Sequence, residues 1–253
     1  MTSAAPELSI VIPAYNEEAR LPRTLRSILD YLLREGLSPE RVEIIVVDDG
    51  STDGTVRVAQ EFAREFSSLR VVENGENRGK GFSVRHGMLE ARGRLALFTD
   101  ADLSSPIEEW PKLRAAIESG YDGAIGSRAL DRSLISVSQT QTRVYAGMIF
   151  NTFVRILTGL PFHDTQCGFK AFVRERARPV FENQRIYRFG FDPEILFLAE
   201  RYGLRVAEVP VRWAHDPATK VSVVRDSIRM FADLFRIRRD WFLRRYARRA
   251  AAV

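Results

Sequence analysis

The chain has 253 residues, of which 45% are hydrophobic and 28% charged, and its formal net charge is +5 at pH 7. This length suits one large domain with a substantial core, and no linker, repeat or low-complexity segment divides it. The single cysteine, Cys167, excludes an internal disulfide and is expected to be a small buried residue. The three histidines lack a zinc-binding spacing, which argues against a zinc site.

Apolar runs that end in acidic or turn residues predict strands, and the stretches between them have helical periodicity. The strands are expected at residues 8–13, 42–48, 69–73, 95–99 and 123–127. The helices are expected near residues 19–35, 53–66, 80–91 and 107–119. This alternation predicts an α/β domain, residues 1–219, with a mostly parallel open sheet and helices on both faces.

Polar side chains follow three of these strands. Tyr15 and Glu17 follow the first, Asp49 the second, and Asp100 and Asp102 the fourth. Ligands of open α/β sheets bind outside the carboxyl ends of the strands, so these residues should converge on one crevice. A nucleotide could stack on Tyr15 and donate base or ribose hydrogens to Asp49. The two carboxylates of Asp100 and Asp102 suit Mg2+ or Mn2+ bound to a diphosphate, although a solvated turn or an N-cap by Asp102 is the alternative.

Four segments, by their order and spacing, resemble the sugar-nucleotide site of inverting family-2 glycosyltransferases with the GT-A fold. They are Pro13-Ala14-Tyr15-Asn16-Glu17, Asp48-Asp49-Gly50-Ser51, Asn77-Arg78-Gly79-Lys80-Gly81 and Asp100-Ala101-Asp102. Three later segments narrow the resemblance to transferases that act on polyprenyl phosphates, and to the dolichyl-phosphate glucosyltransferase branch before the mannosyltransferase branch. They are Gly126-Ser127-Arg128, Asp164-Thr165-Gln166-Cys167-Gly168-Phe169-Lys170 and Phe189-Gly190-Phe191-Asp192-Pro193-Glu194.

The resemblance implies transfer of a hexose, most simply glucose from UDP-glucose, to dolichyl or polyprenyl phosphate. Asp102, with Asp100 or Ser104, would hold the divalent metal. Ser104 departs from the mannosyltransferase pattern, which has a glutamine at this position. The residues expected to bind the nucleotide sugar are Pro13, Tyr15, Glu17, Val47, Asp49, Lys80, Asp100, Ala101, Arg128 and Lys220. The segment from Asn77 to Gly81 has other interpretations: Gly79 and Gly81 can cap a helix, and Arg78 with Lys80 can be a solvated pair.

The remaining catalytic roles concern charge and position. Arg128 and Lys220 would add positive charge at the leaving group, and Arg143 would position the acceptor phosphate, unless it is an exposed arginine at a helix start. Asp164 and Gln166 would approach the sugar and the acceptor, or form a capping turn. The other expectations are that Lys170 helps to bind phosphate, and that Asp192 and Glu194 bind sugar hydroxyls or only cap and charge the helix that begins there.

The basic residues concentrate in residues 220–253, which contain ten Lys or Arg and three Asp. Aromatic and aliphatic residues recur there at helical spacing, as in a basic amphipathic helix on an anionic membrane surface. Residues 144–160 form a second amphipathic segment. The alternative is a helix packed on its own domain, and without a recognition motif no nucleic-acid partner is expected.

No segment reads as a membrane-spanning helix or a signal peptide, so the expected attachment is peripheral, at the cytoplasmic face of the membrane. Three other functions stay open at this point. The same fold could use GDP-mannose, could act on a soluble or polysaccharide acceptor, or could be a silent module that binds sugar nucleotides.

Overall fold

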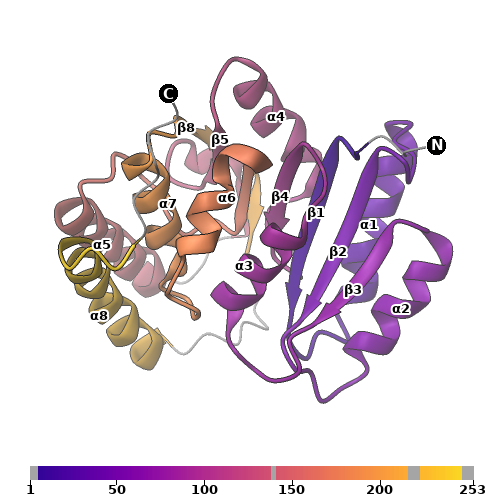
Figure 1. The fold of residues 1–253 in the computed structure, drawn as a ribbon, viewed down its shortest axis with the longest axis horizontal. Coiled ribbons are helices and arrows are strands. Elements are labelled where there is room, and N and C mark those ends of the chain that lie inside the picture. The colour runs from indigo at the N-terminus through magenta and orange to yellow at the C-terminus, as the bar shows by residue number, and fades with distance from the viewer. Residues whose placement is uncertain (1–4, 138–140, 216–222, 247–253) are drawn as a thin grey trace.

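The structure is a computed structural model that describes residues 5–137, 141–215 and 223–246, without the side chains of residues 141–143 and 223–226. Its main sheet has seven strands in the order β3-β2-β1-β4-β7-β5-β8 (Figure 1). The strands are β1 (Leu8–Ala14), β2 (Val42–Asp48), β3 (Leu69–Glu73), β4 (Leu95–Thr99), β5 (Gly123–Ser127), β7 (Phe169–Val173) and β8 (Val206–Pro210). All five predicted strands are present, to within one residue at each end.

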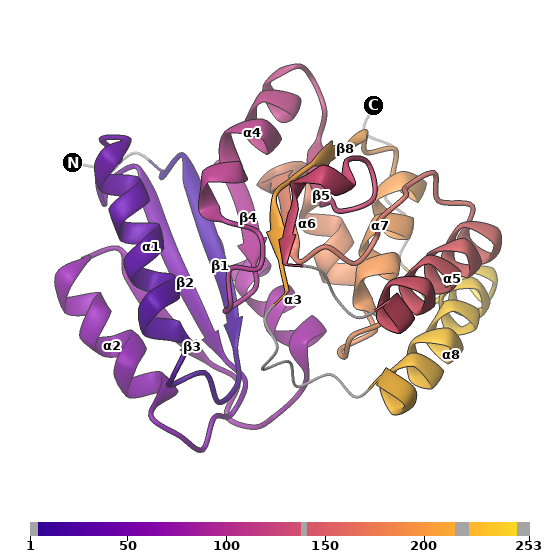
Figure 2. The same ribbon diagram turned by 180° about the vertical axis from the view of Figure 1, so that it is seen from behind.

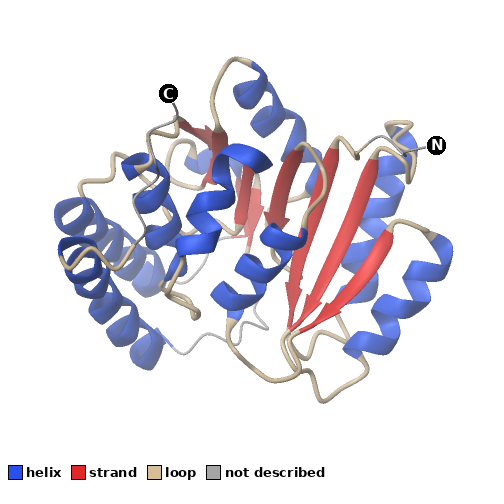
Figure 3. Ribbon diagram, in the orientation of Figure 1, coloured by secondary structure: helices blue, strands red, loops and turns tan. Residues whose placement is uncertain are grey.

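Helices cover both faces of this sheet, as the sequence predicts (Figure 3). They are α1 (Leu21–Arg34), α2 (Thr55–Glu65), α3 (Lys80–Glu90), α4 (Trp110–Glu118), α5 (Gln141–Thr158), α6 (Arg174–Asn183), α7 (Phe191–Arg201) and α8 (Val223–Phe242). Short 3-10 turns η1 (Ile107–Glu109) and η2 (Arg132–Leu134) and a small sheet of β6 (Ile135–Val137) and β9 (Trp213–Ala214) complete the described part.

The central strands are apolar on both sides, which explains their continuous hydrophobic runs. Ile10 and Ile12 of β1 belong to the core beneath α1, α2 and α4, the helices that face the viewer in Figure 2. Val11, between them, belongs to the opposite core with α3, α6 and α7. Side chains that alternate along a strand therefore anchor the two helical layers.

Strand β7 is the main departure from the predicted elements. It lies between β4 and β5 and runs antiparallel to both. Its start therefore lies at the same edge as the carboxyl ends of β1, β2, β4 and β5, and so does the segment 164–168 that precedes it. Its sequence contains Lys170, whose charge masks a strand that is in fact buried.

Helices α5 and α8 pack together beside α7 (Figure 1). The ring of Phe231 meets the rings of Phe150 and Phe153, each at 5.2 Å between centroids. Leu234 and Ile237 of α8 are fully buried in the core that α5 and α7 share. The inner face of the C-terminal helix therefore packs on its own domain, as the alternative interpretation of residues 220–253 expects.

Candidate functional site

Two carboxylates and a lysine meet where β4 ends. The Lys80 ammonium lies 2.6 Å from Asp100 Oδ1, and Asp102 Oδ1 accepts a hydrogen bond of 2.9 Å from the Ser104 amide. Burial and the neighbouring Asp100 charge raise the pKa of Asp102 above its ordinary value. Among the described residues, Asp100 is paired with Lys80 and Asp102 has no such ion pair.

This donor set fits a divalent cation only with help from a substrate. Among the described residues, no group of three or more His, Cys, Asp or Glu is arranged to hold a metal. Mg2+ and Mn2+ are commonly bound by one or two carboxylates, with phosphate oxygens and water as the other ligands. A cation beside Asp102 would also favour its ionised form. The amide of Ser104 orients Asp102, and its hydroxyl as a metal ligand stays a prediction.

The loop that carries Lys80 is fixed by Asp49. Asp49 Oδ1 accepts from the Arg78 amide at 3.0 Å and from Asn74 Nδ2 at 2.8 Å, and Oδ2 accepts from the Gly79 amide at 2.8 Å. The side chain is only 3% exposed. In the structure the Asp49 carboxylate holds the loop, and its predicted contact with the nucleotide stays a prediction.

Lys80 itself is a partner of the acidic cluster and not half of a solvated pair. Burial lowers its pKa, but the carboxylates of Asp100 and Asp192 outweigh burial and hold the pKa above its ordinary value. Arg78, in contrast, is exposed, with its guanidinium 4.9 Å from the centre of the Phe82 ring. Of the two cations expected in this loop, Lys80 is the one directed to the strand ends.

The other residues predicted to bind the nucleotide differ in how exposed they are to solvent. Pro13 and Val47 are buried and pair with each other across β1 and β2. Glu17 is buried and forms an ion pair with Arg20 at 2.6 Å, and the Ala101 carbonyl accepts from Thr24. Tyr15 is 37% exposed. Tyr15 alone of these five is exposed enough to offer a broad surface to a base, and nucleotide contact stays a prediction for all of them.

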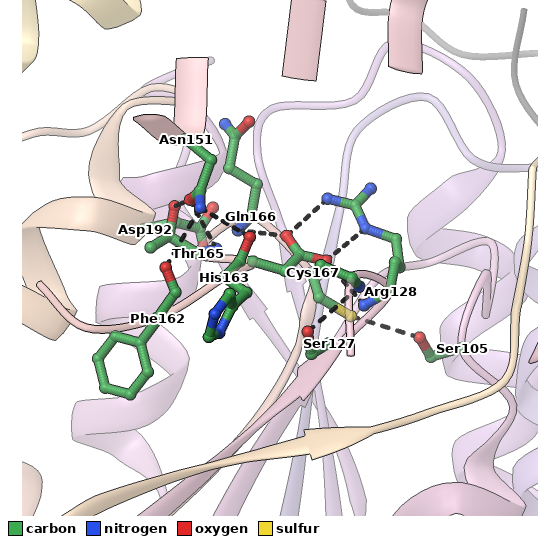
Figure 4. Close-up of polar contacts among 12 residues, drawn as sticks. Ser105, Ser127, Arg128, Asn151, Phe162, His163, Thr165, Gln166, Cys167 and Asp192 are labelled. Atoms are coloured by element: carbon green, nitrogen blue, oxygen red, sulfur yellow. Dashed lines mark hydrogen bonds and ion pairs between the residues drawn. The ribbon is translucent and has the colours of Figure 1, made fainter. Parts of the chain in front are cut away.

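Arg128 is clamped by the carboxylate of Asp164, and Figure 4 draws the two contacts of the Arg128 guanidinium as dashed lines. Its Nε lies 2.6 Å and its Nη2 2.8 Å from the two oxygens of Asp164, which also accepts from the Arg128 and Gln166 amides. Burial alone would raise the pKa of Asp164, but Arg128 lowers it to about 2. Arg128 also lies over the Trp213 ring at 5.3 Å. The result is a fixed positive charge beside the acidic cluster.

Asp164 holds Arg128 and also accepts from the Gln166 amide, which is the turn that the alternative interpretation expects. Its contact with sugar and acceptor stays a prediction. Two residues that the sequence analysis did not assign hold the segment 162–166. Glu208 of β8 accepts from the amides of His163 and Asp164, and Asn151 of α5 donates to the carbonyls of Phe162 and His163. The only sequence signal for Asn151 is a polar residue in an apolar helix. The side chain of Gln166 is half-buried, with Nε2 4.0 Å from the Met230 sulfur of α8.

Lys170 does not reach a phosphate. It is completely buried, donates to the Cys167 carbonyl at 2.6 Å and forms an ion pair with Asp192. Lys170 is too buried for the expected phosphate contact, and its charge and that of Asp192 neutralise each other beneath the site. Asp192 lies in the first turn of α7, as the helix alternative expects. Cys167 is buried as expected, and burial raises the pKa of its thiol to about 11.

Gly168 allows the segment 164–168 to approach the acidic cluster. A Cβ added to Gly168 would lie 2.1 Å from a carboxylate oxygen of Asp100. Any side chain there would displace Asp100 or the segment that holds Arg128.

Lys220 lies outside the described residues, and Arg143 lies in the first turn of α5 with its side chain outside them. Their roles stay predictions.

The chain was compared with known proteins. The glycosyl transferase family 2 domain matches residues 9–181. The chain belongs to glycosyltransferase family 2. It is 42% identical over 243 residues to a dolichyl-phosphate beta-glucosyltransferase of Drosophila melanogaster, covering 91% of this chain and 74% of that protein. The enzyme of the same name from Homo sapiens is 35% identical, with 93% of this chain and 76% of that protein covered.

Solved structures confirm the GT-A fold of this family-2 glycosyltransferase. Glucosyl-3-phosphoglycerate synthase of Mycobacterium tuberculosis, in complex with Mn2+, UDP and glucosyl-3-phosphoglycerate, has a TM-score of 0.65 at 22% identity. The alignment covers 99% of this chain and 83% of that one. Mannosyl-3-phosphoglycerate synthase of Rubrobacter xylanophilus has a TM-score of 0.67 at 21% identity, covering 98% and 78% of the two chains.

Glu194 neither caps its own helix nor lies free to meet a sugar. It is fully buried, and its carboxylate accepts from the Arg185 and Ile186 amides and from the Tyr246 hydroxyl. Burial raises the pKa of Glu194 to about 7, against the lowering effect of these hydrogen bonds and of Arg236. The prediction of a cap or of a sugar contact is therefore wrong at this position.

The raised pKa of Glu194 makes stability depend on pH. The folded protein prefers the protonated carboxyl of Glu194. Its contribution to the free energy of unfolding is therefore fully present below the pKa of the unfolded chain, 4.5, and is lost as the pH rises through the folded pKa of about 7. Glu194→Gln removes this titration. We expect the free energy of unfolding of the wild type, relative to this variant, to fall by about 2.5 kcal/mol between pH 5 and pH 8. Urea unfolding at both pH values measures it, and a constant difference would contradict the assignment.

Proposed function

We propose that this family-2 glycosyltransferase transfers glucose, with inversion, from UDP-glucose to dolichyl or another polyprenyl phosphate. The observation that carries the proposal is the 42% identity to a dolichyl-phosphate beta-glucosyltransferase over 91% of the chain. The fold supports the donor, since a synthase with the same fold binds Mn2+ and UDP-glucose. The carboxylate of Asp102 and the guanidinium of Arg128, at the carboxyl edge of the sheet, support the proposed donor.

The proposed mechanism rests on charge. Mg2+ or Mn2+, held by Asp102 and the diphosphate, would act as a Lewis acid on the leaving group. Arg128, fixed by Asp164, adds a positive charge that needs no reorganisation as negative charge develops on the leaving phosphate. Lys80 holds Asp100, so Asp102 would be the carboxylate that binds the cation.

The acceptor requires positioning more than deprotonation. A polyprenyl phosphate is already anionic near neutral pH, so its oxygen can attack the anomeric carbon without a strong base. Arg143, at the start of α5, remains the proposed partner of the acceptor phosphate, and Lys220 a proposed second cation. Gln166 lies between the Arg128 clamp and Met230 of α8, and we propose that the lipid enters the site on this side.

A transfer assay tests this function. UDP-glucose, UDP-N-acetylglucosamine and GDP-mannose, each radiolabelled, are offered with a short polyprenyl phosphate and Mn2+. We expect labelled lipid from UDP-glucose, no product with EDTA, and a roughly thousandfold loss in Asp102→Asn, equivalent to about 4 kcal/mol of transition-state stabilisation.

The same assay separates the competing functions. Labelled lipid from GDP-mannose would show that the transferred sugar is mannose and not glucose. Product only with a water-soluble acceptor would contradict the lipid, and nucleotide binding without any product would indicate a silent module. Asp30→Asn, on the exposed surface of α1, is the matched control and should retain full activity.

We also propose that α5 and α8 rest on an anionic membrane surface at its cytoplasmic face. In the described residues no helix is long and apolar enough to span a bilayer. The outer faces of the two helices nonetheless expose many apolar side chains, a patch made by Tyr145, Met148, Ile149, Phe153, Ile156, Ile228, Phe235, Phe242 and Leu243.

Basic residues accompany this apolar patch. Arg155, Arg229, Arg236, Arg238 and Arg239 are exposed on the same two helices. Apolar area that inserts at the lipid boundary and cations near anionic headgroups, at about 1 kcal/mol each, favour binding together. The occupant that matches both features is an anionic bilayer, which is also where a polyprenyl phosphate resides.

Vesicle binding tests the surface without disturbing the core. Truncation at Lys220 would remove buried Leu234 and Ile237 and so disturb the core. Substitutions on the outer face of α8 test membrane binding without this side effect. Phe235→Ser with Phe242→Ser should reduce binding to phosphatidylglycerol vesicles by more than about tenfold, because each ring contributes on the order of 1 kcal/mol or more when buried. Leu33→Ser, at an 81% exposed position of α1, is the control. Equal binding by both variants would contradict the proposal.

A further inference from the structure

One buried carboxylate joins the C-terminal segment to a turn of the main domain. Glu194 accepts hydrogen bonds from the Ile186 amide at 2.8 Å, the Arg185 amide at 3.0 Å and the Tyr246 hydroxyl at 2.8 Å. Tyr246 is only 3% exposed and lies just beyond the end of α8. Three donors from two distant parts of the chain thus meet on one side chain.

The turn formed by residues 184–190 rests directly on the loop that carries Lys80. Gln184 donates to the Gly81 carbonyl at 2.8 Å, and the Phe82 amide donates to the Tyr187 carbonyl at 3.0 Å. The ring of Phe82 meets that of Tyr187 edge-on at 5.3 Å. These contacts connect the turn to the first residues of α3.

The two glycines beside Lys80 show how close this approach is. A Cβ at Gly79 would lie 2.4 Å from the Tyr187 carbonyl oxygen, and one at Gly81 would lie 2.7 Å from the Phe191 Cβ. Gly79 also has a φ of 105°, a conformation that favours glycine. The loop fits the turn without spare space, so a shift of the turn would move Lys80 relative to Asp100.

The C-terminal helix holds the same turn from its other side. Arg236 donates to the Arg185 carbonyl, and Arg185 donates to the Arg245 carbonyl, each at 3.3 Å. Asp240 of α8 is 1% exposed and lies 3.8 Å from Arg185. The turn is therefore enclosed between α8 and the Lys80 loop.

The geometry points to Glu194 as a positioning residue for the donor site: by tying Tyr246 to the 184–190 turn, it lets the C-terminal helix set the position of Lys80 beside Asp100. This inference rests on the proposed function for its kinetic consequence. It also gives α8 a second role, since the helix that we propose to lie on the membrane would fix the donor loop.

Substitution of Tyr246 tests this link most gently. Tyr246→Phe removes one hydroxyl and keeps the buried ring. We expect the KM for the sugar nucleotide to rise about fivefold, while kcat and the KM for lipid phosphate stay within about twofold, because only the donor loop is loosened. Tyr31→Phe, a buried tyrosine of α1 that is 4% exposed, should change none of these. An unchanged donor KM, or equal rises in both KM values, would overturn the inference.

Hydrogen exchange gives a readout that does not depend on turnover. Amides of residues 79–84 should exchange faster in Tyr246→Phe and in Glu194→Leu than in the wild type. Glu194→Gln, which keeps an acceptor oxygen, should restore slow exchange. Unaltered exchange of this loop in Tyr246→Phe would overturn the inference even if Glu194→Leu does not fold. If the wild type transfers no sugar to any acceptor, the proposed function fails, and exchange alone decides whether Glu194 positions the loop.

Discussion

A charge imbalance at the carboxyl edge of the sheet is the constraint on which the site depends. Within the described residues, three carboxylates share this partly buried edge with two ammonium groups: Asp100, Asp102 and Asp192 with Lys80 and Lys170. All three carboxylates raise the pKa of Lys80. Two of the three carboxylates have an ammonium partner. Asp102 is the one without such an ion pair, and burial together with the Asp100 charge raises its pKa. A divalent cation bound to a diphosphate would complete this arrangement, and the proposed reaction follows from that need.

The surrounding structure keeps these charges in place through backbone donors. Asp49 holds the Lys80 loop through the amides of Arg78 and Gly79. Asp164 holds Arg128, and Glu208 in turn accepts from the amides of His163 and Asp164. Antiparallel strand β7 makes this possible, because its direction brings the segment 164–168 to the same edge as the parallel strands. The buried acids around the site mostly position other groups.

Much of the fold follows from sequence patterns. The five predicted strands are apolar runs closed by acidic or glycine-containing turns, and in a parallel sheet such strands must bring their ends together. Strand β7 could not be predicted from an apolar run, because Lys170 interrupts it. A lysine is expected at the surface unless its buried partner, here Asp192, is known. A five-residue sequence also does not show whether its strand runs parallel or antiparallel to its neighbours.

The roles of the acidic residues were harder to predict than their location. Asp49, Asp164 and Glu194 all accept from backbone amides, and a sequence does not show which amides are near. Helical spacing likewise identified α8 as amphipathic without showing that Leu234 faces inward and Phe235 outward. Residue type and spacing located the site, whereas the partners of each residue required the structure.

The central claim is that Asp102 needs a cation which arrives with the diphosphate. Calorimetric titration of the wild-type protein with UDP, in Mn2+ and in EDTA, tests it most directly. The account predicts that UDP binds at least about tenfold more tightly with Mn2+, a difference of about 1.4 kcal/mol, and that Mn2+ alone binds weakly. Equal UDP affinity in Mn2+ and in EDTA would contradict the account.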